Sequence, residues 1–74
     1  MAAAKGEATV TVNGMTLPLR STHLLDLVRQ MGHDPDRAGI AVAVNGEVIP
    51  RARWSERALL PGDEVEIVGA VQGG

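Results

Sequence analysis

The chain has no cysteine, and its only aromatic residue is one tryptophan, with no phenylalanine or tyrosine. Without cysteine there is no disulfide to support the fold and no thiolate to act as nucleophile or metal ligand. A cysteine-free chain suits a reducing compartment, so we expect a cytoplasmic protein. The core has to be aliphatic, and Trp54 is either a lid on that core or an exposed anchor for a partner, with the lid favoured.

Long apolar runs and long runs of one charge are also missing. No stretch approaches the roughly 20 apolar residues that cross a bilayer, and the opening MAAAKGEA lacks the apolar core of a signal peptide. The net charge is −2, without a basic block, which argues against nucleic acid as a partner. We therefore expect neither membrane nor nucleic-acid contacts.

What is present is a chain of 74 residues that is 45% hydrophobic, which predicts one small domain with a modest core. Residues 8–20 have the pattern of a β-hairpin around Asn13-Gly14, a pair that tolerates the positive φ angles of a two-residue turn. Pro18 lacks a backbone N–H, so the second strand of this hairpin is expected at a sheet edge.

A helix is predicted over residues 21–32. Its apolar side chains recur at helical spacing and form one stripe: Leu24, Leu27, Val28 and Met31, widened by Leu25. Ser21 or Thr22 is expected to accept hydrogen bonds from the first free N–H groups, and Gly32 to end the helix in a left-handed conformation.

The rest of the chain predicts short strands. They are an apolar strand at 40–44, a turn at Asn45-Gly46, a returning strand at 47–50, an irregular or one-turn helical connection at 51–60, and a last strand at 64–71. In the last strand, alternation predicts Val65, Ile67 and Val71 on one face, and Glu64 and Glu66 on the other.

This order predicts an α+β fold of the ubiquitin-like β-grasp type: a mixed four- to five-stranded sheet with one main helix packed on one face. In that fold the first and last strands lie side by side in mid-sheet. We expect a loose N-terminus at 1–7, the β-grasp domain at 8–71, and a flexible tail at 72–74.

Reaction signatures are sparse. The sequence has no phosphate-binding loop, nucleophile elbow, dinucleotide-binding glycine pattern or zincin helix. His23 and His33 are too far apart for a metal pair on one helical face, so no metal site is expected. A chance pairing of Ser21 or Ser55 with a histidine is the weakest interpretation.

The last residues, Gln72, Gly73 and Gly74, are a stronger candidate. Extended, they reach about 10 Å, and glycines without Cβ atoms can thread a channel that excludes larger side chains. From the spacing alone two interpretations stay open: a tail that enters another protein, or a frayed end.

Three segments resemble the sulfur carrier proteins of thiamine biosynthesis: LLDLVRQMG (24–32), VAVNGEVIPRARW (42–54) and LLPGDEVEIVGAVQGG (59–74). The resemblance runs from about residue 8 to the end and rests mainly on a final Gly-Gly that follows GDEVEIV. Relatives often have three terminal glycines, and Gln72 stands in place of the first.

The resemblance implies a mechanism. A separate adenylating enzyme, related to the ubiquitin activators, joins the Gly74 carboxylate to AMP with ATP and Mg²⁺. A sulfur donor such as a cysteine desulfurase then replaces AMP by sulfur, and thiazole synthase takes the sulfur from the thiocarboxylate. In that scheme the chain binds no cofactor of its own and is a co-substrate, not an enzyme.

Partner contacts are expected near the tail, at Val68 and Val71. Arg51 and Arg53, with Arg57, form either a basic docking patch or a solvated loop, and the loop is slightly favoured.

Rival functions stay open. The small subunit of molybdopterin synthase tends to have aromatic or proline residues before its tail, which VEIVGAVQGG lacks. A ubiquitin-like protein modifier would use the same tail chemistry. A passive β-grasp binding module, in which the Gly-Gly is incidental, is the rival from another class.

Overall fold

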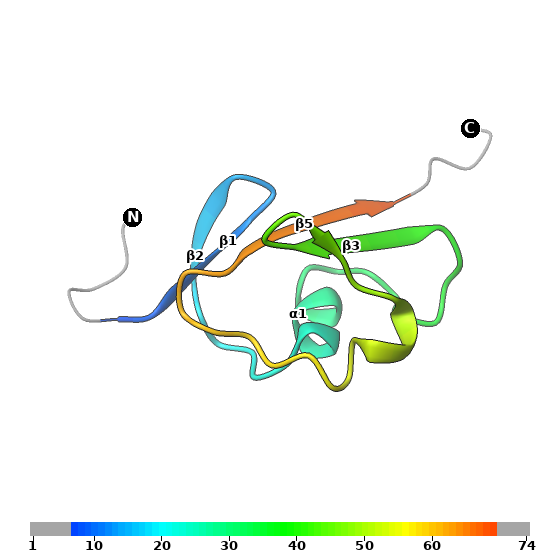
Figure 1. Cartoon of the computed structure of the whole chain (residues 1–74), viewed down its shortest axis with the longest axis horizontal. Helices are drawn as coiled ribbons and strands as arrows, with labels where there is room; N and C mark the ends of the chain where they lie inside the picture. Colours follow the sequence, from blue (N-terminus) through cyan, green and yellow to red (C-terminus); the bar gives the residue numbers. More distant parts are fainter. Residues whose placement is uncertain (1–6, 70–74) are drawn as a thin grey trace.

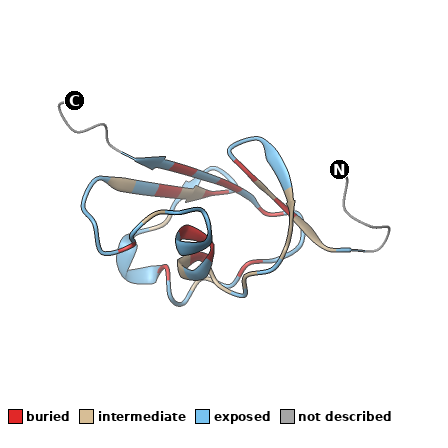
Figure 2. Cartoon of the chain, turned by 180° about the vertical axis from the view of Figure 1, so that it is seen from behind, coloured by how far each residue is buried: buried red, intermediate tan, exposed pale blue. Residues whose placement is uncertain are grey.

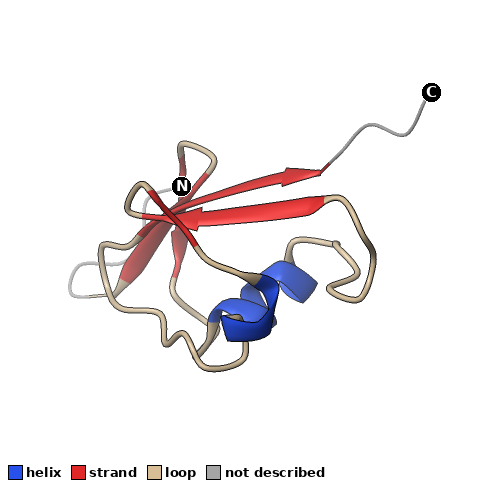
Figure 3. Ribbon diagram, turned by 45° about the vertical axis from the view of Figure 1, so that its right-hand side comes forward, coloured by secondary structure: helices blue, strands red, loops and turns tan. Residues whose placement is uncertain are grey.

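The structure is a computed structural model that describes residues 7–69, and it contains one mixed sheet and one helix (Figure 1). The elements are β1 (Thr9–Val12), β2 (Met15–Pro18), α1 (Leu24–Gln30), β3 (Ile40–Val44), β4 (Glu47–Val48), a 3₁₀ turn η1 (Arg51–Arg53) and β5 (Glu64–Gly69). The helix lies against one face of the sheet (Figure 3), as the order of elements predicted.

The last strand, β5, occupies the middle of the sheet, whose strand order is β2-β1-β5-β3-β4. It runs parallel to β1 and antiparallel to β3. The prediction that the first and last strands are neighbours is therefore confirmed. Pro18 lies on the edge strand β2, where a missing N–H leaves no gap in the ladder.

The core lies between the helix and the inner face of the sheet, and buried residues alternate with exposed or partly buried ones along β1, β3 and β5 (Figure 2). All of its members except Trp54 are aliphatic: Val10, Val12, Leu24, Leu27, Val28, Val42, Val44, Leu59, Val65 and Ile67. Trp54 is 1% exposed, and its indole Nε1 donates a hydrogen bond of 2.8 Å to the carbonyl of Ile49. The interpretation of Trp54 as a core residue is confirmed.

The helix is shorter than predicted, and its first turn is capped differently. It begins at Leu24, and the N-cap residue His23 makes no side-chain capping bond. The free N–H groups of Leu24 and Leu25 donate instead to the backbone carbonyls of Arg57 and Trp54. The predicted Ser21 or Thr22 cap is therefore wrong: the segment packed against the helix start supplies the acceptors.

The end of the helix follows the prediction at Gly32, which has φ +90°. The N–H of Gly32 bonds the carbonyl of Arg29, and the N–H of His33 bonds that of Val28. These two bonds form a Schellman motif. Met31 was expected in the buried stripe but is 37% exposed. The helix ends at Gln30, so Met31 lies beyond the helical turns that face the sheet.

Two strand boundaries also differ. The strand predicted at 47–50 is assigned only to Glu47–Val48, although the N–H of Ile49 still bonds the carbonyl of Val42. The strand predicted at 64–71 is described as far as Gly69. Val71, the tail and residues 1–6 of the expected N-terminal segment lie outside residues 7–69. Within that range no helix is long and apolar enough to cross a membrane.

Truncating Leu27 to alanine is expected to lower the free energy of unfolding by about 2–5 kcal/mol, because the side chain is buried and its loss leaves a cavity. Met31→Ala on the same helix is the matched control, with an expected change of about 1 kcal/mol or less. Urea unfolding followed by tryptophan fluorescence measures both. Equal losses in the two variants would mean that the buried face of the helix is assigned wrongly.

Candidate functional site

The candidate site is the C-terminal half of β5 together with the sheet face that the helix leaves open. Of the residues predicted from sequence, Val68 lies on this face and is 63% exposed. Val71, Gln72, Gly73 and Gly74 fall outside the described residues. The described part of the candidate site is therefore the strand that leads to the tail and the surfaces beside it.

Asn13 fixes β5 from the side of β1. This residue adopts φ +50° in the first hairpin turn, and its backbone N–H bonds the carbonyl of Val65. Its side-chain amide donates to the carbonyl of Ile67 at 3.2 Å and accepts from the Ile67 N–H at 2.8 Å. The amide thus acts as one more peptide group of β1 and continues the ladder past the end of that strand.

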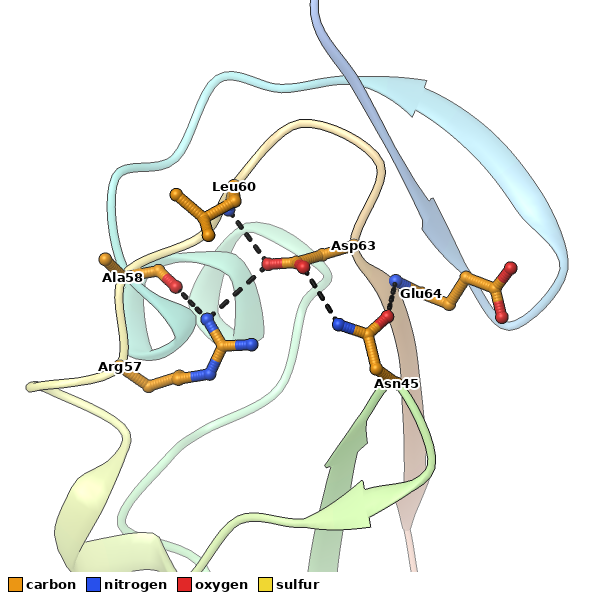
Figure 4. Close-up of polar contacts among 6 residues, drawn as sticks. All are labelled: Asn45, Arg57, Ala58, Leu60, Asp63 and Glu64. Atoms are coloured by element: carbon orange, nitrogen blue, oxygen red, sulfur yellow. Dashed lines mark hydrogen bonds and ion pairs between the residues drawn. The ribbon is translucent and has the colours of Figure 1, made fainter.

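Asn45 and Asp63 fix the beginning of β5 from the side of β3 (Figure 4). Asn45 donates to Asp63 Oδ1 at 3.0 Å and accepts from the N–H of Glu64 at 3.0 Å. The Asp63 carboxylate, 6% exposed, also accepts from the N–H of Leu60 at 2.8 Å. A guanidinium nitrogen of Arg57 lies 3.5 Å from Asp63 Oδ2. The buried charge is thus paired and hydrogen-bonded, which is what its burial requires.

Sequence reasoning missed these roles of the two asparagines and of Asp63. The motif VNG occurs at 12–14 and 44–46, and its two Asn-Gly pairs predict turns alone. The repeat is a usable signal, since both asparagines precede a turn glycine and both bond β5. Asp63 lies in PGD (61–63), a sequence typical of turns that gives no sign of its burial.

The open face of the sheet carries an apolar strip that we define as Ala41, Ala43, Val48 and Val68. The register places these side chains together: Ala41 pairs with Val68, and Ala43 with Val48. Val48 is 70% exposed. Exposed Glu64 and Glu66 border the strip on β5. An apolar area rimmed by charges at the end of the last strand has the character of a protein-binding surface.

Arg51 and Arg53, for which a docking patch and a solvated loop were both open, differ in their surroundings. The Arg51 guanidinium stacks 4.9 Å from the ring centre of Trp54 and donates to the carbonyl of Arg37. Arg51 therefore holds the loop between α1 and β3 against the tryptophan. Arg53 is exposed and lines a surface hollow beside β4, together with Glu47, Glu56 and other residues.

The two histidines have different surroundings. His23 bonds its neighbour Thr22 at 3.0 Å, whereas His33 is half-buried near Gly69. Over residues 7–69, no group of three histidine, aspartate or glutamate side chains is arranged to hold a metal ion.

Comparison with known proteins gives concordant results. The model of the ThiS family matches residues 7–74. The sulfur carrier protein ThiS of Thermus thermophilus is 35% identical over 65 residues, which cover 88% of this chain and 98% of that protein. The sulfur carrier protein ThiS of Escherichia coli is 31% identical over 49 residues, which cover 66% of this chain and 71% of that protein.

A solved structure has the same fold. The crystal structure of the thiamine biosynthesis protein ThiS from Geobacter metallireducens superposes with a TM-score of 0.71 at 25% identity, covering 89% of this chain and 99% of that one. Its solution structure gives a TM-score of 0.72. The ubiquitin-like β-grasp prediction is thereby confirmed. Because the family model spans nearly all of the sequence and the strand order agrees with the fold, this chain belongs to the ThiS family.

Proposed function

We propose that this protein carries sulfur for thiazole formation in thiamine biosynthesis, as a thiocarboxylate on Gly74. The observation that supports the proposal is the position of β5, which is paired with β1 at its start and with β3 along its length, and has its described end at Gly69, five residues before Gly74. A strand held in this way gives the tail a fixed starting point. The two terminal glycines have no Cβ atoms, so they suit a narrow channel in a partner enzyme.

The proposed chemistry begins with activation, because a carboxylate is a poor electrophile. An oxygen of the Gly74 carboxylate attacks the α-phosphorus of ATP, and pyrophosphate leaves. The terminal sulfur of a persulfide then attacks the acyl carbon, and AMP leaves with the C–O bond electrons. A second thiol cleaves the resulting acyl disulfide at its S–S bond. The net change is one carboxylate oxygen replaced by sulfur.

The partners divide this work. An adenylating enzyme of the ubiquitin-activator type binds ATP and Mg²⁺, a donor such as a cysteine desulfurase supplies the persulfide, and thiazole synthase accepts the sulfur. This chain acts as a protein co-substrate. We propose the cytoplasm as the compartment, since the steps use ATP and reduced thiols. Membership of the ThiS family favours thiamine over molybdopterin as the destination of the sulfur.

The apolar strip with Val68 is the proposed docking surface for the adenylating enzyme. Within the strip, Val68 is the residue nearest in sequence to the tail. Val71 was predicted to contribute to the same interface. Arg53 is the basic residue that we keep in this role. Arg51 is better explained by its contacts with Trp54 and the carbonyl of Arg37.

Deleting Gly73 and Gly74 is expected to abolish ATP–pyrophosphate exchange by the adenylating enzyme, because the shortened tail cannot bring a carboxylate to the nucleotide. The thermal midpoint should stay within a few degrees of the wild-type value, since the core and the five-stranded sheet described over residues 7–69 are unchanged by the deletion. Retained exchange in the truncated protein would refute the proposed function.

Placing a charge on the apolar strip with Val68→Glu is expected to raise the KM for the carrier in that exchange assay by roughly ten-fold or more, because an unpaired charge would be buried on docking. Thr16→Glu, which adds the same charge at the far edge of the sheet, is the matched control. Arg53→Glu should raise KM by a smaller factor. Equal KM values for the Val68 and Thr16 variants would remove the strip from the docking surface.

A further inference from the structure

The half of β5 that leads to the tail is paired on one side only. β3 pairs with β5 along its length, from Val65 to Gly69. β1 is in register with β5 only at Glu64 and Val65, and the Asn13 side chain extends this contact to Ile67. Figure 1 shows β5 running past the tip of the first hairpin with β3 alone beside it, and Figure 3 shows the same arrangement from another side.

The direction of the backbone groups shows which N–H and C=O groups of β5 face this open edge. In a strand, successive residues point their N–H and C=O groups to opposite sides. Ile67 directs both groups toward Asn13, so Gly69, two residues on, directs its own toward the same side. Within residues 7–69 no protein group accepts a hydrogen bond from the Gly69 N–H.

The space around Gly69 suits the approach of another chain. A Cβ atom built on Gly69 would lie 4.0 Å from Cε1 of His33, which is ordinary contact. The imidazole therefore flanks the helix side of the edge, and exposed Val68 flanks the open face. The outermost strands of the sheet are less suited to pairing, because β2 ends at Pro18 and β4 has two residues followed closely by Pro50.

We propose that the enzyme that acts on the tail adds an extended segment of its own to this edge and pairs with the backbone of Gly69. The inference rests on the proposed function. Residues 70–74 span at most about 17 Å, so an enzyme that holds the Gly74 carboxylate must bring its surface close to Gly69. The partner strand takes the place next to β5 beyond the Asn13 amide and extends the sheet beside Gly69.

The test compares Gly69→Pro with Gly69→Ala in ATP–pyrophosphate exchange by the adenylating enzyme. Both variants add a Cβ atom, and only proline removes the N–H group. Because that N–H faces away from β3, its loss leaves the β3 ladder intact. The KM for Gly69→Pro is expected to exceed that for Gly69→Ala by roughly ten-fold, with a smaller change in kcat, and the two thermal midpoints should be similar.

Amide exchange in the wild-type protein provides a measurement independent of whether the proline variant folds. The Gly69 N–H should exchange at least several-fold more slowly in the complex with the adenylating enzyme than in the free protein. An unchanged amide exchange rate in the complex, or equal KM values for two folded Gly69 variants, would overturn the inference. ATP–pyrophosphate exchange with the wild-type protein would in that case still support the proposed function. Absence of wild-type exchange would overturn both.

Discussion

The placement of β5 between β1 and β3 is the constraint on which the rest of the structure depends. Its inner side chains, Val65 and Ile67, are in the core, and its backbone is bonded from both neighbouring strands. A parallel neighbour on one side requires the chain to cross over between β1 and β5, and the helix and the connection through Trp54 occupy that crossover. The first half of β5 therefore belongs to the most firmly held part of the sheet, and β3 alone holds the last residues before the tail.

Two side-chain amides form hydrogen bonds with β5 beyond the ends of the neighbouring strands β1 and β3. Asn13 and Asn45 supply hydrogen bonds to β5 from opposite sides, and Asp63 links the second of them to the turn before β5. Each such bond contributes about 0.5–1.5 kcal/mol net, a noticeable share of the roughly 5–10 kcal/mol that stabilises a domain of this size. No disulfide can add to them, because the chain has no cysteine.

The fold could be predicted from local patterns because each pattern has a direct physical cause. Asn-Gly pairs fit turns with positive φ, the spacing of Leu24, Leu27 and Val28 fits one helical face, and Pro18 fits an edge. The helix start could not be predicted, since its acceptors are backbone carbonyls at Trp54 and Arg57, far away in sequence. The asparagine bonds to β5 and the burial of Asp63 were missed for the same reason. At the candidate site, sequence indicated Val68, but only the structure separates Arg51, which packs on Trp54, from exposed Arg53.

Intact mass spectrometry is the most direct test of whether sulfur is carried at the end of the tail. The purified chain would be incubated with the adenylating enzyme, ATP, Mg²⁺ and a persulfide donor, and fragmentation would locate any modification. If Gly74 carries the sulfur, the expected result is a mass increase equal to one oxygen replaced by sulfur, located at that residue. An unmodified chain with no AMP adduct, alongside an enzyme shown to be active on another carrier, would contradict it.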